Sequence, residues 1–198
     1  MTVAILIPAA GFGTRMRGAD KLLQIVDGIP LLRRVALRAL AATPLVIVTL
    51  PDLGGARAQA IGDLAVQKVP VPDAATGMAA SLRRGAAKVP GDAAVMIVPA
   101  DMPDLTSDDF SCIINAFLAT PHAILQQGTA ADGTPGHPVL FPPDCLPAFA
   151  KLNGDHGAKQ ILMANMHRLQ RVELAGNHAL IDLDTPEAWD AWNAARGQ

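Results

Sequence analysis

The sequence predicts an α/β fold in which helices cover both faces of an open, mostly parallel, three-layer sheet. Three continuous apolar runs, at 3–7, 45–50 and 93–98, lack the alternation of a half-exposed strand, and such runs usually form parallel strands buried on both faces. Segments with helical spacing lie between them, so strand and helix alternate. We expect one domain, residues 1–198, whose second half is a β elaboration.

Composition limits the possible functions. Of the 198 residues, 51% are apolar and 17% are charged, which is typical of a globular protein. The formal charge of −2 disfavours duplex nucleic acid as a partner. No apolar run is long enough to cross a membrane, and no charged region precedes the short apolar start, so we expect a cytoplasmic protein. Cys112 and Cys145 lie far apart and are expected to be buried or half-buried free thiols.

The first strand is followed by a turn and a helix. The stretch 24–30, with Asp27 and Gly28 at its middle, predicts a small hairpin. Pro30 then opens a helix over 31–42, because proline suits the first helical position and the apolar residues share one face. The stretches 54–64 and 77–89 are further candidate helices.

The clearest helix begins at Ser107, a suitable N-cap, followed by two aspartates in the positive first turn. Its apolar residues recur at i, i+3, i+4, i+7 and i+8: Phe110, Ile113, Ile114, Phe117 and Leu118. Beyond it, four short segments are expected to be strands: 123–127, 137–141, 168–174 and 179–183. The stretch 128–136, GTAADGTPG, predicts a loop, and Thr185 predicts the N-cap of a final helix.

The first strand leads into a glycine loop that carries cations, ILIPAAGFGTRMRGADKLL at 5–23. Glycines let backbone N–H groups approach phosphate oxygens, while Arg15, Arg17 and Lys21 would neutralise their charge. The pattern therefore predicts a nucleotide triphosphate site, with a plain tight turn as the alternative. The third glycine of the dinucleotide fingerprint and the Gly-Lys-Ser/Thr of the P-loop are both missing, which disfavours a nicotinamide-dependent dehydrogenase.

Aspartates follow the third apolar run and precede the last helix. Ligands bind at the carboxyl ends of parallel strands, so the loop containing Asp101 should face the glycine loop. A carboxylate opposite phosphates is explained if Mg²⁺ lies between them, although Asp101 could equally be a turn residue. Asp182 and Asp184 are two apart at an expected strand end, hence on one face. We favour Asp182 as the second ligand, because Asp184 adjoins the Thr185 cap.

Six motifs give the chain a specific resemblance: PAAGFGTRM followed after four residues by KLL, then TGMAASLRRG, VPADMPDLT, GTPGHPVLF, LNGDHGAKQIL and IDLDTPE. They occur in the order seen in the MobA-like nucleotidyltransferases, and the chain most resembles the molybdenum cofactor cytidylyltransferase (MocA-type) branch from residue 3 to about 189. The resemblance implies a Rossmann-like, Mg²⁺-dependent transferase. It would move CMP from CTP to a phosphorylated acceptor, molybdopterin, and release pyrophosphate, with a molybdoenzyme receiving the product.

The resemblance also assigns residues. Nucleotide contacts would come from Ala9, Ala10, Gly11, Gly13, Arg15, Lys21, Gly77 and Ser81. Arg15, Lys21 and Asp101 would be the catalytic residues, and Asp101 and Asp182 would bind Mg²⁺. The acceptor would contact Gly136, His137, Pro138 and Asp155.

Three alternatives stay open at this point. Ala10 stands where guanylyl enzymes of this fold have a second glycine, which favours CTP over GTP by the effect of one methyl group. The first loop also resembles that of cytidylyltransferases for other phosphorylated small molecules, so the acceptor is open. A non-catalytic molybdopterin-binding carrier is the other class of function, and the presence of Arg15, Lys21, Asp101 and Asp182 argues against it.

Overall fold

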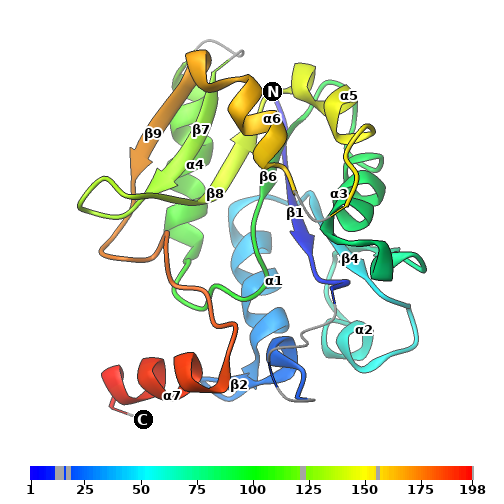
Figure 1. The fold of residues 1–198 in the computed structure, drawn as a ribbon, viewed down its shortest axis with the longest axis vertical. Coiled ribbons are helices and arrows are strands. Elements are labelled where there is room, and N and C mark those ends of the chain that lie inside the picture. The colour runs from blue at the N-terminus through cyan, green and yellow to red at the C-terminus, as the bar shows by residue number, and fades with distance from the viewer. Residues whose placement is uncertain (12–15, 17–18, 121–123, 155–156, 198) are drawn as a thin grey trace.

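A computed structural model describes residues 1–11, 16, 19–120, 124–154 and 157–197 (Figure 1). The described residues form a seven-stranded sheet in the order β5-β4-β1-β6-β8-β7-β9. The strands are β1 (Val3–Pro8), β4 (Val46–Leu50), β5 (Gln67–Pro70), β6 (Ala94–Ile97), β7 (Leu125–Thr129), β8 (Pro135–Phe141) and β9 (Leu169–Glu173). Only β8 runs antiparallel to its neighbours, so the expected open, mostly parallel sheet is confirmed.

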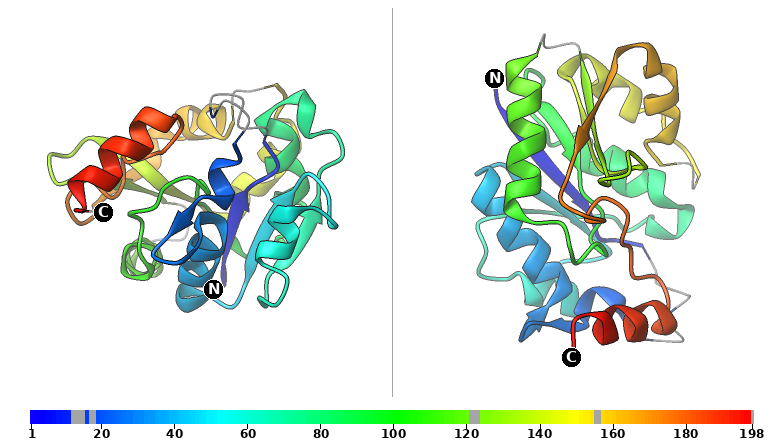
Figure 2. Two further views of the ribbon diagram at one scale, coloured as in Figure 1. Left: turned by 90° about the horizontal axis from the view of Figure 1, so that it is seen from below. Right: turned by 90° about the vertical axis from the view of Figure 1, so that its left-hand side faces the viewer.

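Helices pack on both faces of this sheet (Figure 2). They are α1 (Leu31–Ala42), α2 (Ala56–Ala60), α3 (Met78–Ala86), α4 (Ser107–Ala119), α5 (Leu146–Phe149), α6 (Lys159–Ala164) and α7 (Pro186–Ala195). Side chains of β1 alternate between two cores: Ile5 and Ile7 pack with α1 and α4, whereas Leu6 packs with α3, α5 and α6. Burial on both sides explains why this strand is a continuous apolar run.

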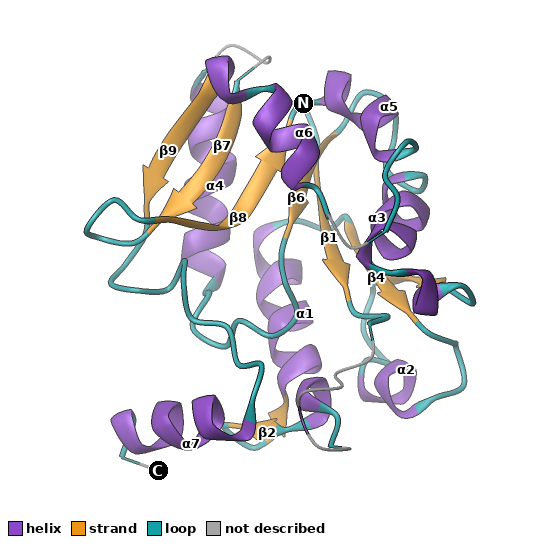
Figure 3. Cartoon of the chain, in the orientation of Figure 1, coloured by secondary structure: helices purple, strands orange, loops and turns teal. Residues whose placement is uncertain are grey.

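A short hairpin and the last helix lie together at one end of the molecule (Figure 3). The hairpin consists of β2 (Ile25–Val26) and β3 (Ile29–Pro30), and its turn has positive φ at Asp27 and Gly28, as expected for an Asp-Gly turn. Asp27 pairs with Arg196 just beyond α7, at 2.9 Å. Trp192 of α7 donates to Asp104 in the loop after β6, at 3.0 Å, which fixes α7 near the carboxyl end of β6.

Several element boundaries differ from the expectation. The N-cap of α4 is Thr106 and not Ser107, because Asp109 completes a capping box with Thr106. Of the expected 128–136 loop, four residues belong to strands, and the hairpin closes with Ala130 donating to the Thr134 carbonyl. Strand β5 and helices α5 and α6 are short and were not expected. The exposed Cys112 contradicts its expected burial, whereas Cys145 is buried, and both are free thiols.

The expected strand at 179–183 is wrong, since this stretch is a turn followed by irregular backbone. Two of its hydrogen bonds reach separate parts of the fold: the Ala179 carbonyl accepts from the His137 N–H, and the Leu183 N–H donates to the Asp101 carbonyl. Within the described part of the chain, no helix is both long and apolar enough to span a membrane.

Candidate active site

The sheet changes its direction of growth at β1. From β1 the chain adds β4 and β5 on one side and then returns to place β6 on the other, so the connections after β1 and β6 leave in opposite directions. Ligands of such sheets bind in the crevice that opens at this switch point. We therefore expect a ligand to bind at the loops that follow Pro8 and Ile97.

A cleft of ≈ 1040 Å³ lies at this point. Its lining includes most of the described residues expected at the site: Ala9, Gly11, Lys21, Gly77, Ser81, Asp101, Gly136, His137 and Asp182. Residues from the N-terminal loop, from α3 and from the C-terminal half thus meet in one cavity. Arg15, Gly13 and Asp155, which we also expected at the site, lie outside the described residues.

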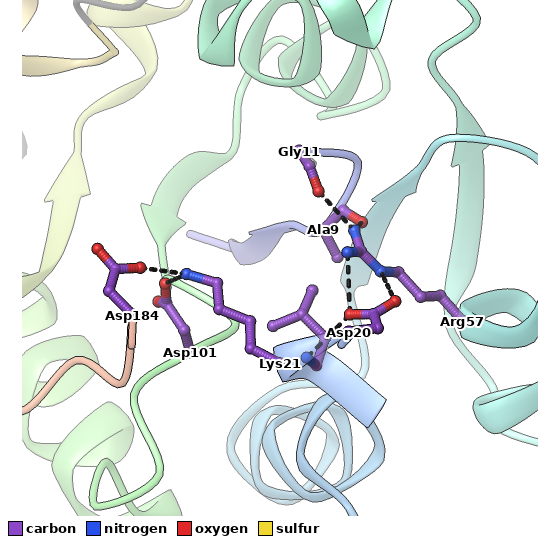
Figure 4. Close-up of polar contacts among 8 residues, drawn as sticks. Ala9, Gly11, Asp20, Lys21, Arg57, Asp101 and Asp184 are labelled. Carbon is purple, nitrogen blue, oxygen red and sulfur yellow. Dashed lines mark hydrogen bonds and ion pairs between the residues drawn. The ribbon is translucent and has the colours of Figure 1, made fainter. Parts of the chain in front are cut away.

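Lys21 lies between two carboxylates inside the cleft (Figure 4). Its ammonium group donates to Oδ2 of Asp101 and to Oδ1 of Asp184. The three side chains retain between 16% and 23% of their exposure, so the pairs are largely screened from water. Burial alone would lower the pKa of Lys21, but the charges and hydrogen bonds of Asp101 and Asp184 outweigh it and raise the pKa above its usual value. Lys21 is therefore a firmly charged cation.

The carboxylate that meets Asp101 at this cation is Asp184, whereas we had favoured Asp182. The expected strand is absent there, so a spacing of two residues does not place both side chains on one face. Asp184 instead precedes the Thr185 cap of α7 and turns toward Lys21. Asp182 also lines the cleft, where its charge acts on His137.

The residues present fit a magnesium ion in one particular way. Among the described residues, no three His, Cys, Asp or Glu side chains are placed to hold a metal ion by themselves. Asp101 and Asp184, however, converge on one cation, and Mg²⁺ characteristically takes one or two carboxylates and completes its shell with water and substrate phosphates. This donor set suits an ion that arrives with a triphosphate.

His137 and Gly136 lie on β8 and line the cleft. Nδ1 of His137 is buried and lacks a hydrogen-bond partner among the described residues. Burial lowers the pKa of His137, and the charges of Asp101 and Asp182 oppose this only in part. The imidazole is therefore neutral at neutral pH and suited to a hydrogen bond with a ligand.

Gly136 has a packing role that the sequence does not reveal. A Cβ at this position would lie 2.0 Å from the Ala179 carbonyl oxygen, closer than any real contact. The glycine thus lets β8 approach the segment that carries Asp182 and Asp184. Gln127, which we did not single out, also lines the cleft and donates from Nε2 to the Gly136 carbonyl at 3.1 Å. Pro138, joined to His137 by a cis peptide bond, is not part of the lining.

Gly77 and Ser81, which are expected to contact the nucleotide, lie at the start of α3 and line the cleft. Gly77 has φ +112° at the start of α3, a conformation that favours glycine, and Ser81 one turn later is buried. Ala10 differs from the expectation that its side chain faces the base, because it does not line the cleft. It is fully buried against a small apolar cluster: Val71, Ala74 and Ala80.

Arg57 and Asp20 are important residues that sequence reasoning missed. Arg57 lies on α2 and binds Asp20 through two nitrogens while it donates to the carbonyls of Ala9 and Gly11 (Figure 4). Asp20 immediately precedes Lys21 and accepts from the Leu22 N–H at 3.0 Å. The sequence offered only an arginine within the candidate helix 54–64. Any residue has a backbone carbonyl, so the sequence does not indicate that Ala9 and Gly11 bind Arg57.

Comparison with known proteins gives one family and several similar folds. The MobA-like NTP transferase domain matches residues 5–172. The crystal structure of Rv0371c from Mycobacterium tuberculosis H37Rv is 26% identical with TM-score 0.79, over 100% of this chain and 98% of that one. The same protein in complex with manganese is 24% identical with TM-score 0.78, over 96% and 97%.

A more distant structure has the same fold. CMP:2-keto-3-deoxy-manno-octonic acid synthetase complexed with CTP is 17% identical with TM-score 0.77, and the alignment covers 100% of this chain and 99% of that one. No curated protein matches the sequence significantly.

Proposed function

The chain belongs to the MobA-like NTP transferase family, and from this premise we propose that it transfers CMP from CTP to a phosphorylated acceptor, molybdopterin, with release of pyrophosphate. The observation that carries the proposal is the cluster of Lys21, Asp101 and Asp184 in a cleft at the switch point of the sheet. A cation beside two carboxylates is suited to holding a triphosphate together with a divalent metal ion.

The nucleotide would occupy the side of the cleft formed by the loop after β1 and the start of α3. Ala9 and Gly11 would offer backbone to the base and ribose, and Gly77 and Ser81, at the start of α3, would contact the nucleotide as well. Lys21 would bind the triphosphate together with Arg15. CTP is favoured by the resemblance and by the CTP complex of the synthetase that shares the fold.

The reaction needs placement more than proton transfer. A phosphate monoester is already ionised near neutral pH, so its oxygen attacks the α-phosphorus of CTP without a dedicated base. The oxygen–phosphorus bond to the acceptor forms as the bond to the pyrophosphate oxygen breaks, and the positive charge of Lys21 stabilises the leaving group. Asp101 and Asp184 would hold Mg²⁺, which supplies further charge neutralisation when bound; the manganese complex of Rv0371c supports a divalent ion.

The acceptor would lie on the β8 side of the same cleft. Neutral His137, Gly136 and Gln127 form a polar part of the cleft lining there, near Asp182 and Leu180, which also line the cleft. Such a lining suits a flat heterocycle that both donates and accepts hydrogen bonds. The choice of molybdopterin depends on the motif resemblance, and other phosphorylated small molecules are the competing acceptors.

A pyrophosphate-release assay tests the proposal. Purified protein with Mg²⁺ and molybdopterin should release pyrophosphate with CTP and much less with GTP. Equal or greater pyrophosphate release with GTP would indicate a guanylyltransferase. Release only with another phosphorylated acceptor would show that molybdopterin is not the substrate. Tight binding of CTP and molybdopterin without pyrophosphate would instead indicate a non-catalytic carrier. Lys68→Met is a suitable control variant, because the half-buried Lys68 donates to the Gly62 carbonyl and is not part of the cleft lining.

A further inference from the structure

We propose that Arg57 is a positioning residue that joins the two ends of the nucleotide loop and thereby places Lys21 for the triphosphate; this inference depends on the function proposed above. Arg57 is only 9% exposed and is not part of the cleft lining. It borders a smaller pocket that Asp20 also lines, so it can shape the cleft without lining it.

Four hydrogen bonds define the role. Nη1 donates to the carbonyl oxygens of Ala9 at 2.7 Å and Gly11 at 2.8 Å, which begin the loop. Nε and Nη2 donate to the two carboxylate oxygens of Asp20 at 2.7 and 3.0 Å, which ends the loop. One rigid guanidinium thus joins residues on both sides of the segment 12–19 (Figure 4).

The contact with Asp20 extends directly to Lys21. The Oδ1 atom of Asp20 that Arg57 binds also accepts from the Leu22 N–H, and the Asp20 carbonyl accepts from the Leu23 N–H at 3.0 Å. These bonds set the start of the short 3₁₀ helix Lys21–Leu23. Through Asp20, Arg57 therefore sets the position of the Lys21 backbone and the direction of its side chain. The charge of Arg57 itself is neutralised by Asp20.

The carbonyl contacts favour an anion on the opposite side. A trans peptide places its carbonyl oxygen and its N–H on opposite sides, so the peptide that joins Ala9 to Ala10 directs its N–H away from Arg57. Arg57 draws two carbonyl oxygens, which would repel phosphates, to the face of the loop behind the cleft. The effect is geometric, because the three donors of a lysine share one nitrogen and cannot span both oxygens of Asp20 and two carbonyls as a planar guanidinium does.

Nucleotide binding by Arg57→Lys and Arg57→Met tests this role. We expect kcat/KM for CTP to fall about 10²-fold in both variants, the loss that accompanies a misplacement of about 1 Å. The affinity for CMP, which lacks the outer two phosphates, should fall much less than that for CTP, because CMP loses only the support of Ala9 and Gly11 and not the Lys21 contact. If lysine restores CTP binding, or if CMP and CTP affinities fall together, the positioning role is wrong.

Hydrogen exchange of the ligand-free protein supplies a second measurement. The amides of Leu22 and Leu23 should exchange faster in the Arg57 variants than in the wild type, and Asp20→Asn should show the same change. Arg168→Met is the matched control, since Arg168 pairs with Asp144 at 2.7 Å and is similarly sheltered but lies outside the cleft lining. Unchanged exchange in the Arg57 variants would overturn the inference. Wild-type protein that binds neither CTP nor GTP would instead refute the proposed function, whatever the exchange rates show.

Discussion

Lys21 and Asp101 are 80 residues apart in the sequence and form an ion pair in the cleft. Asp184, a further 83 residues along (163 − 80), binds the same ammonium group. The cation thus occupies the point at which both carboxylates converge. Asp101 and Asp184 would hold a divalent ion with the same oxygens that now bind Lys21, so Lys21 and the ion would compete for them.

Lys21→Met should separate metal binding from catalysis. Turnover should fall by about 10²–10³, the loss that follows removal of one stabilising donor, and the sequence predicts the same for Arg15→Ala. The affinity of nucleotide-free protein for Mn²⁺ should rise about tenfold or more, because a charged hydrogen bond contributes roughly 1.5–3 kcal/mol and no longer competes. Calorimetric titration with Mn²⁺ and pyrophosphate release measure the two effects, with Lys68→Met as control. Weaker Mn²⁺ binding in the variant would contradict the competition.

Asp184→Asn should impair metal use more than Asp182→Asn. Both changes keep the side-chain shape, but only Asp184 shares the cation with Asp101. We expect Asp101→Asn and Asp184→Asn to raise the Mg²⁺ concentration needed for half-maximal turnover by about tenfold or more, since each removes a charged oxygen ligand. Titration of activity and of Mn²⁺ binding checks the order. A larger effect of Asp182→Asn than of Asp184→Asn would indicate that Asp182 is the second metal ligand.

Gly136→Ala should destabilise the protein and disturb the carboxylate segment. Its methyl group would lie 2.0 Å from the Ala179 carbonyl oxygen, so either β8 or the segment after Ala179 has to move. Overpacking of this kind costs about 1–3 kcal/mol of unfolding free energy. Urea unfolding measures the loss, and weaker Mn²⁺ binding would show that Asp184 has moved. Gly91→Ala is the control, because, apart from its neighbours in the chain, no atom of the described residues lies within 4 Å of a Cβ at Gly91.

His137 should make stability fall on the acid side of neutrality. Burial lowers its pKa in the folded state below the usual 6.5, with Asp101 and Asp182 opposing in part. The unfolded chain therefore binds the proton first as pH decreases, and stability is lost below the unfolded pKa, whereas above it the residue has no effect. Urea unfolding at about pH 8 and about pH 5.5, within the range where histidine titrates, should show a larger acid loss for wild type than for His137→Gln. Parallel losses in the two proteins would show that His137 is not the source.

Much of the fold was predictable from local pattern. The three apolar runs became parallel strands because burial on both faces demands a continuous apolar strand, and β1, β4 and β6 meet that demand. The glycine loop and Asp101 were expected on one edge because carboxyl ends of parallel strands share an edge, and Lys21 does reach Asp101 there. Strand β5 and helix α6 were missed because they are short and partly exposed, which leaves little periodicity to detect.

The sequence by itself determined the open, mostly parallel sheet with its strands β1, β4 and β6, the edge at which the cleft opens and, through the order of its motifs, the family. Tertiary structure decided that Asp184 rather than Asp182 meets Asp101, that Gly136 is needed for close packing, and that Arg57 holds the loop. Two physical reasons explain why the sequence did not reveal these contacts. Spacing predicts a shared face only while the backbone stays in a strand, and contacts with backbone carbonyls 46 and 48 residues away leave no pattern in side-chain identity.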